Sequence, residues 1–342
     1  MNLKSELDIE DHAQLCAYLR RSGRLEPGAE LEARTLRGGV SSRAVWVRLP
    51  SGAEWVLKQA LAKLRVKTDW FSDPARIGRE AEGLRACARI ASRGATPELV
   101  FEDSVNLIVA MTAVPQPHDN WKQLLLGGQV SIDHFTQFAE LLAALQVRSY
   151  EQRCDLAALF ADRSYFETLR IEPYYRYTAG RVPEAAAFYE ELITDTLAQR
   201  DCFVHGDFSP KNVLVHDGRL VLVDFEVVHW GDPAFDVGFS MTHLLAKAGH
   251  VSGHRRSLAA AALHYWKTYS AAVAPRFAGL EKRVIRHTLG CLLARVDGRS
   301  PLEYLDVTGR ETQRASALAL MHRMPETMPE LIESFVRGWN SR

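Results

Sequence analysis

The chain has 342 residues, of which 47% are hydrophobic and 25% charged, a composition typical of a globular protein that buries a sizeable core. Lys plus Arg and Asp plus Glu balance at 42 each, so the charge gives no case for a nucleic acid or an anionic membrane as partner. The five cysteines form no C-x-x-C pair, which predicts neither a zinc site nor a disulfide framework and favours a reducing, cytoplasmic location. The acidic segment "MNLKSELDIEDH" predicts no signal peptide, and no apolar run reaches the roughly 20 residues that span a bilayer.

The N-terminal third alternates between helical and strand periods. Residues 8–21 have helical spacing, with Asp8 as the expected N-cap. Over residues 31–58 the apolar period falls to two, which predicts an antiparallel meander. A helix is expected next over residues 72–90, started by Ser72 or Asp73, and two more strands are expected over residues 97–103 and 106–114.

Two prolines, Pro115 and Pro117, interrupt the strand pattern, and beyond them the chain is mainly helical in period. The sequence therefore predicts an α+β fold with two lobes. Residues 1–114 would form a small lobe of antiparallel sheet plus one helix, and residues 115–342 a larger, mainly helical lobe.

One hairpin is expected inside the helical part, where "VLV" and "LVLV" flank the turn "HDGR". Asp207 and Asn212 precede its first strand and Asp224 follows its second, so strand pairing brings Asn212 and Asp224 together. Carboxylate and amide oxygens suit Mg²⁺, and an aspartate five residues before the asparagine fits a base that orients an attacking hydroxyl. Each residue alone is typical of a turn or cap, so the combination carries the prediction.

The segments "HGDFSPKN", "VDFE" and "GDPAFD" together resemble the motifs of the aminoglycoside phosphotransferase and choline-kinase-like family. These are small-molecule kinases with a protein-kinase-like fold, and the resemblance spans roughly residues 30–310. It implies ATP as donor, with GTP possible, and Mg²⁺ as cofactor. It implies further that Asp207 is the catalytic base and that Asn212 and Asp224 bind the metal. Lys211 either approaches the γ-phosphate or is a solvated surface lysine.

Three neighbours of these residues have supporting interpretations. His205 is expected to hold the loop by packing and hydrogen bonding. In the family that the chain resembles, the residue at Asp236 anchors the backbone of the catalytic loop from a helix N-terminus. Glu226 either reaches the metal through water or is an ordinary surface carboxylate.

A kinase of this fold also needs a loop that covers the phosphates. The segment "LRGGVSSRAV" lies between two expected strands, where this loop belongs. Gly38 and Gly39 would give it flexibility, and Ser41 and Ser42 would offer hydrogen-bond donors. A plain hairpin turn is the alternative.

Lys58 stands in an apolar strand and needs an anion if it is buried. On the helical wheel of the next helix Glu80 lies beside the apolar face and Glu82 nearly opposite, so Glu80 is the expected partner. The strand that ends at Val114 is the expected hinge, where the backbone of Thr112 to Val114 would bind adenine and Met111 would line the pocket.

The acceptor site is less well defined by the sequence. The aromatic and basic run of Tyr174, Tyr175, Arg176 and Tyr177 predicts part of it, with a packed turn between helices as the alternative. Arg295 and Asp297 either face the same cleft or cap the next helix. The stretch after Asp224 is too short for the activation segment of a protein kinase and carries no A-P-E element, which disfavours a peptide substrate.

The preferred function is Mg²⁺-dependent transfer of the γ-phosphoryl group of ATP to a hydroxyl of a small metabolite alcohol or sugar. An aminoglycoside or macrolide resistance phosphotransferase is an alternative, although no dense acidic cluster for a polycation is visible. A non-catalytic nucleotide-binding regulator is another, favoured only by the imperfect glycine loop. The sequence does not name the acceptor or the oligomeric state.

Overall fold

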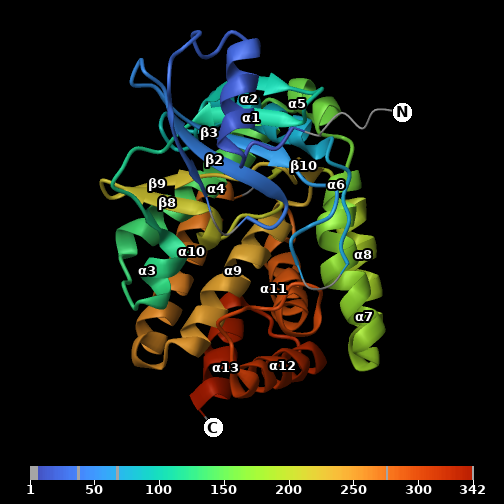
Figure 1. Cartoon of the computed structure of the whole chain (residues 1–342). Coiled ribbons are helices and arrows are strands. Elements are labelled where there is room, and N and C mark those ends of the chain that lie inside the picture. Colours follow the sequence, from blue (N-terminus) through green and yellow to red (C-terminus); the bar gives the residue numbers. More distant parts are fainter. Residues whose placement is uncertain (1–6, 37–38, 67–68, 275, 341–342) are drawn as a thin grey trace.

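The computed structural model describes residues 7–36, 39–66, 69–274 and 276–340. A five-stranded antiparallel sheet lies at the top of Figure 1 and a group of helices below it. The α+β fold with a small antiparallel sheet and many helices is therefore confirmed. Within these ranges no helix is both long and apolar enough to cross a membrane.

The sheet has the strand order β1-β2-β3-β5-β4. Its strands are β1 (Glu32–Thr35), β2 (Ser42–Arg48), β3 (Glu54–Ala60), β4 (Leu99–Asp103) and β5 (Ile108–Thr112). The central strand β3 pairs with both neighbours, so Lys58 lies between Ala44 and Val109. Because side chains alternate along a strand, Lys58 points to the face opposite that of buried Leu57.

Helix α1 (His12–Arg21) covers the Leu57 face of the sheet. It begins later than expected, because Asp11 rather than Asp8 is the N-cap and accepts the Gln14 N–H at 3.0 Å. Asp8 instead accepts the Glu10 N–H at 2.9 Å in a turn before the helix.

Helix α2 (Arg76–Ile90) lies on the other face, and it is fastened to the helical part of the chain as well as to the sheet. The guanidinium of Arg79 donates to the Leu159 carbonyl at 2.8 Å, and the Arg148 guanidinium donates to the Ile90 carbonyl at 3.2 Å. At Gly83 a Cβ would meet the Cβ of Phe225 at 2.8 Å, so only glycine permits this close approach.

Arg76 stands at the start of α2 and has no exposed surface. It donates to the carbonyl oxygens of Ser41 and Leu61 and forms an ion pair with Glu226 at 3.0 Å between Nε and Oε2. One side chain thus joins the start of β2, the loop after β3 and the segment that follows Asp224.

The rest of the chain is mainly helical. Its helices are α3 (Trp121–Leu126), α4 (Ile132–Glu151), α5 (Arg153–Leu159), α6 (Ser164–Phe166), α7 (Tyr177–Arg181), α8 (Ala186–Ala198), α9 (Pro233–His250), α10 (Arg255–Val273), α11 (Leu280–Asp297), α12 (Val307–His322) and α13 (Met328–Asn340). Helix α9 is buried along nearly its whole length and packs against α10 and α11 at the centre of this part (Figure 1).

A π-helix, Glu167–Arg176, separates α6 from α7. It was not expected from the sequence, which gives no direct sign of an i→i+5 hydrogen-bond pattern. The only local hint is Pro173 inside it, since proline is poorly tolerated in the interior of an ordinary α-helix.

The predicted hairpin is present as β8 (Val213–His216) and β9 (Arg219–Leu222), with Val213 opposite Leu222. It extends into a three-stranded sheet by β6 (Asp119–Asn120). A further pair, β7 (Cys202–Val204) with β10 (His229–Gly231), also lies in the helical part. The expectation of a single hairpin there was too simple, because strands of two or three residues are too short to show a period.

Candidate active site

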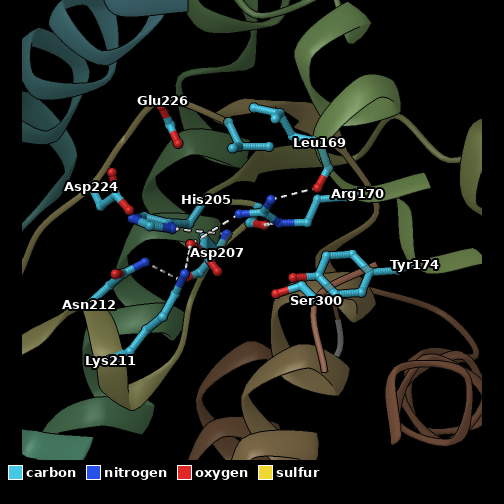
Figure 2. A network of polar contacts seen from close by, with 12 residues as sticks. Leu169, Arg170, Tyr174, His205, Asp207, Lys211, Asn212, Asp224, Glu226 and Ser300 are labelled. Carbon is cyan, nitrogen blue, oxygen red and sulfur yellow. Dashed lines mark hydrogen bonds and ion pairs between the residues drawn. The ribbon is translucent and has the colours of Figure 1, made fainter. Parts of the chain in front are cut away.

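A cavity of about 780 Å³ is lined by residues of both the sheet and the helical part. What we call its sheet end is lined by Ala44, Val56, Lys58, Met111, Val114 and Leu214. What we call its helix end is lined by Lys122, Tyr174, His243, Arg295, Ser300 and Tyr304. Asp207 lies between them: Figure 2 shows it with Asn212 and Asp224 on one side and Tyr174 and Ser300 on the other.

Lys58 bridges two carboxylates at the sheet end. Its Nζ lies 2.7 Å from Glu80 Oε1 on α2 and 2.6 Å from Asp224 Oδ1. The pairing of Lys58 with Glu80 that the helical wheel predicts is confirmed as a contact, and Glu82 pairs instead with Arg79 at 2.9 Å. Burial alone would lower the pKa of Lys58, but the charges of Asp224 and then Glu80 outweigh it and raise that pKa above its usual value.

The loop before Asp207 is held by Asp236, near the start of α9. The carboxylate oxygens of Asp236 accept the N–H groups of His205 at 2.7 Å and Gly206 at 2.8 Å. Gly206 has φ 77°, which favours glycine, and a Cβ there would meet the Val227 carbonyl oxygen at 2.8 Å. The loop-anchoring contact implied for Asp236 is therefore confirmed, and burial raises the pKa of this carboxyl to about 7.

His205 supports the same loop. Its ring is fully buried, and Nδ1 accepts the N–H of Asp207 at 3.2 Å. Burial lowers the pKa of His205 to about 4, so the ring is neutral and has a lone pair to accept this hydrogen bond. Its position agrees with a supporting role.

Two cationic side chains contact the same carboxylate oxygen of Asp207. Its Oδ2 lies 3.0 Å from Arg170 Nη2 and 2.8 Å from Lys211 Nζ, as Figure 2 shows. Burial pushes the pKa of Asp207 upward, but Arg170 and then Lys211 outweigh it and hold the pKa below its usual value. The second oxygen, Oδ1, is buried and has no partner within the described part of the chain. Asp207 thus presents one ionised, unoccupied acceptor at the cavity.

Asn212 and Asp224 are brought together by the hairpin. The Val223 N–H donates to the Asn212 carbonyl at 2.9 Å, immediately beyond the paired residues Val213 and Leu222. The side-chain amide of Asn212 donates to the Asp207 carbonyl at 3.0 Å, which leaves the amide oxygen free. The charge of Lys58, and next that of Lys211, outweighs burial and keeps the pKa of Asp224 well below its usual value.

This donor set fits Mg²⁺. Among the described residues no group of three or more His, Cys, Asp and Glu side chains is arranged to hold a metal by itself. Mg²⁺ commonly takes only one or two protein ligands and completes its octahedron with phosphate oxygens and water. A free amide oxygen beside an ionised carboxylate, both lining the cavity, meets that requirement.

The expected hinge and glycine loop also line the cavity. Met111, Thr112 and Val114 are at its wall, as are Gly39, Ser41 and Ser42, whereas Gly38 lies outside the described residues. The N–H of Thr112 is already bonded to the Glu98 carbonyl at 2.9 Å. The N–H of Ala113 is bonded to the Glu54 carbonyl at 3.0 Å, while that of Val114 has no partner among the described residues. Of the three predicted hinge residues, Val114 is therefore the one whose backbone N–H remains available as a hydrogen-bond donor.

Of the predicted acceptor residues, Tyr174 and Arg295 reach the cavity. Tyr175 is fully buried away from it, with its hydroxyl 2.8 Å from His287 Nδ1. Arg176 is exposed, and Asp297 pairs with Arg314 at 3.0 Å on the outer side of α11. These three predictions are corrected by the structure, because the π-helix and α11 turn the residues to other faces.

Arg170, which was not predicted, lines the cavity together with the predicted Tyr174. They are four residues apart on the π-helix and lie on one side of it, with the Arg170 guanidinium 5.8 Å from the centre of the Tyr174 ring. Glu226 also lines the cavity and pairs with buried Arg76, so the surface-carboxylate interpretation is excluded. No motif indicates Arg170 as a site residue beyond the basic and aromatic character of its segment.

The fold and the residues gathered at this cavity define a small-molecule kinase. Residues 32–280 match the profile of the APH family, described as "Phosphotransferase enzyme family". The match covers most of the chain, and the chain therefore belongs to this family.

One curated relative and two solved structures illustrate the range of the family. The chain is 24% identical over 275 residues to methylthioribose kinase 2 of Oryza sativa subsp. japonica, a match that covers 71% of this chain and 64% of the relative. The chain thus spans less than two thirds of that relative's length.

The structures are a choline/ethanolamine kinase family protein from Mesorhizobium loti and the ADP-bound aminoglycoside phosphotransferase APH(2'')-Ib. The first has a TM-score of 0.53 and 16% identity over 96% of this chain and 99% of its own. The second has a TM-score of 0.51 and 16% identity over 94% of this chain and 99% of its own. At these identities the likeness shows the protein-kinase-like fold alone.

Proposed function

We propose that this protein is an ATP-dependent, Mg²⁺-requiring kinase that transfers the γ-phosphoryl group to a hydroxyl of a small metabolite alcohol or sugar. The observation that carries the proposal is the convergence of Lys58, Asp207, Asn212 and Asp224 on one cavity. The ADP bound to the structurally similar aminoglycoside phosphotransferase supports an adenine nucleotide as donor, with GTP as the second candidate. The five unpaired cysteines suit a reducing cytosol as its location.

The sheet end would hold the nucleotide. Val56, Met111 and Leu214 offer apolar surface to a base, and the free N–H of Val114 offers it a hydrogen bond. Lys58, oriented by Glu80, would contact the phosphates beneath the loop that carries Ser41 and Ser42. In this proposal residues 1–114 are the nucleotide-binding lobe and residues 115–342 the catalytic and acceptor-binding lobe.

Asn212 and Asp224 would hold Mg²⁺, which supplies charge neutralisation at the nucleotide phosphates when it is bound. Asp224 now contacts Lys58 directly, and Asn212 is oriented by its hydrogen bond to the backbone of Asp207. These contacts would fix the orientation of both side chains toward the cavity.

Asp207 would align the acceptor. Its unoccupied Oδ1 can accept the hydrogen bond of the attacking hydroxyl and take its proton as the new P–O bond forms. Arg170 and Lys211 keep the carboxylate ionised and would neutralise charge on the transferred group. Phosphoryl transfer depends mostly on such positioning, so these contacts account for the chemistry that the protein must provide.

A sugar acceptor is supported by the relative that is named a methylthioribose kinase. An aminoglycoside is disfavoured, because it is a polycation and the helix end contains Lys122 and Arg295 but only Glu303 as a further carboxylate beside Asp207.

The test is Mg²⁺-dependent formation of ADP with a panel of amino alcohols, sugars, thiosugars, sugar acids, aminoglycosides and macrolides. Asp207→Ala should lower turnover about 10²- to 10⁴-fold while keeping affinity for Mg²⁺–ADP, and Asp224→Ala should lose both. Asp217→Asn, at a turn of the hairpin and 83% exposed, is the control and should change neither. Normal turnover by Asp207→Ala would refute the assignment.

A further inference from the structure

The helix end of the cavity is more basic than transfer to a neutral alcohol requires. Lys122 and Arg295 line this end, and Arg170 and Lys211 line the neighbouring part of the cavity around Asp207. The Asp207 carboxylate is shared by Arg170 and Lys211, and Glu303 pairs with Lys122. No other carboxylate of the described chain lines this end, so Arg295 is left without one.

Arg295 is nine-tenths buried, and the groups that accept its side-chain hydrogen bonds among the described residues are all uncharged. Its Nη1 donates to Tyr174 Oη at 3.0 Å, to Ser300 Oγ at 2.9 Å and to the Ser300 carbonyl at 2.6 Å. Its Nε is buried without a partner among the described residues. A guanidinium in such surroundings is costly unless an anion completes it, and its planar fork suits a carboxylate or phosphate.

Lys247 on α9 adds a second cation behind this wall. It has no exposed surface, donates to the His243 carbonyl at 3.2 Å and lies 5.5 Å from the centre of the Tyr304 ring. Burial, and next the positive charges of Lys122 and Arg295, lower the pKa of Lys247 to about 7, with Glu303 opposing. His243 Nε2 and the Tyr304 hydroxyl are also buried without partners in the described part of the chain. The cations at this end therefore repel one another, and several buried polar atoms have no hydrogen-bond partner among the described residues.

We propose that the acceptor carries an anionic group, a carboxylate or a phosphate, in addition to the hydroxyl that receives the phosphoryl group. The anionic group binds at the helix end through Arg295 and Ser300, with Lys122 nearby. This inference rests on the proposed function, because Asp207 fixes where the hydroxyl lies. Figure 2 shows Ser300 and Tyr174 across from Lys211. Asp207 and Arg295 line the same cavity, so one small molecule can contact both residues. Hydroxy acids, sugar acids and sugar phosphates have this combination of groups.

The experiment measures kcat/KM for acceptors in pairs that differ mainly in charge. The pairs are glycerate and glycerol, gluconate and sorbitol, and ribose 5-phosphate and ribose, with methylthioribose as a further neutral sugar. We expect at least about a 10-fold preference for the charged member of the productive pair. A neutral acceptor used equally well or better than its charged counterpart would overturn the inference.

Three substitutions test the sign of the charge effect. Arg295→Gln should raise KM for the charged acceptor about 10- to 100-fold, with KM for ATP unchanged, and Arg295→Lys should recover part of the loss. Glu303→Gln should leave that KM equal or lower, because it removes a repelling charge and frees Lys122. Arg314→Gln, a partly exposed arginine of α12 outside the cavity, is the matched control and should change nothing. A Glu303→Gln variant that binds the acceptor more weakly would point to a cationic substrate instead.

Two further measurements keep the outcomes apart. If Arg295→Gln loses Mg²⁺–ADP binding through misfolding, Ser300→Ala replaces it, with a smaller rise in the same KM expected. If no acceptor of the panel is phosphorylated, malonate and inorganic phosphate are titrated into the Mg²⁺–ADP complex by calorimetry. If Arg295→Gln or Ser300→Ala weakens the binding of malonate or phosphate at least about 10-fold, the anion site is supported. If neither probe binds to the unsubstituted protein, the inference is overturned. Failure of the kinase itself would appear separately, as normal turnover in Asp207→Ala or as no nucleotide binding.

Discussion

Asp236 offers a way to disturb the active site without touching any ligand. Both oxygens of its carboxylate accept backbone N–H groups, at 2.7 and 2.8 Å, from the two residues that precede Asp207. Asp236→Asn keeps the shape of the side chain, but its NH₂ group would face one of these donors. The substitution therefore removes one hydrogen bond and leaves one buried N–H unsatisfied.

The expected loss can be estimated from these contacts. A charge-assisted hydrogen bond contributes about 1.5–3 kcal/mol, and a buried unsatisfied donor costs about 1–3 kcal/mol. Burial of the carboxylate offsets part of this, because it raises the pKa of Asp236 to about 7 and so makes the ion less favourable. We expect the free energy of unfolding to fall by about 2–4 kcal/mol near pH 7. We also expect kcat to fall by about 10-fold or more, since the loop no longer fixes Asp207.

Urea unfolding followed by circular dichroism measures the first quantity, and steady-state turnover measures the second. Asp217→Asn is the control for changing a carboxylate to an amide, because Asp217 is exposed in a turn where asparagine also tolerates the positive φ of 47°. It should stay within about 0.5 kcal/mol of the unsubstituted protein. The reasoning is refuted if Asp236→Asn unfolds with an unchanged free energy and an unchanged kcat.

Three other outcomes are expected. Gly206→Ala should lower the free energy of unfolding by about 1–3 kcal/mol more than Gly52→Ala, since both have positive φ but only the first would bring a Cβ to 2.8 Å from the Val227 carbonyl oxygen; equal losses in urea unfolding would contradict this. Lys247→Met should stabilise the fold by a few kcal/mol at pH 6 and by less at pH 10. Between the lowered pKa of Lys247, about 7, and the usual 10.5, the native state binds fewer protons than the unfolded chain, so the cost of the buried lysine falls as the pH rises. If thermal unfolding shows the same stability difference between the variant and the unsubstituted protein at both pH values, this explanation is wrong. Lys58→Met should raise KM for ATP about 10-fold or more in steady-state assays, and unchanged ATP kinetics would speak against the phosphate contact.

The sequence predicts best those contacts that depend on the residue spacing within one helix or one hairpin. The alternation of β8 and β9 sets their register, and this register places Asn212 next to Asp224. The wheel of α2 likewise distinguishes Glu80, which meets Lys58, from Glu82, which does not. In both cases the sequence spacing alone determines the face on which each side chain lies.

The acceptor residues were harder to predict for two physical reasons. Tyr174 and Tyr175 are adjacent and cannot share one helical face, and only the packing of the helix decides that Tyr174 lines the cavity with Arg170 while Tyr175 is buried. On α11, Arg295 and Asp297 are two residues apart and cannot share one face, so at most one of them could reach the cavity. The buried partners of Arg76 come from segments far apart in the chain, and no local pattern indicates such contacts.

The attachment of α2 has a mechanical consequence. Arg79 and Arg148 hold the helix to the helical part of the chain, whereas Lys58 belongs to the sheet. Arg76, at the start of the helix, contacts both parts. If the sheet swung away from the helical part while α2 stayed with the latter, β3 would have to shear past the helix. Such a movement would stretch the ion pair between Lys58 and Glu80, now 2.7 Å long, together with the hydrogen bonds from Arg76 to the Ser41 and Leu61 carbonyls. The separation of the Lys58 and Glu80 side chains would therefore report any movement of the sheet relative to the helical part.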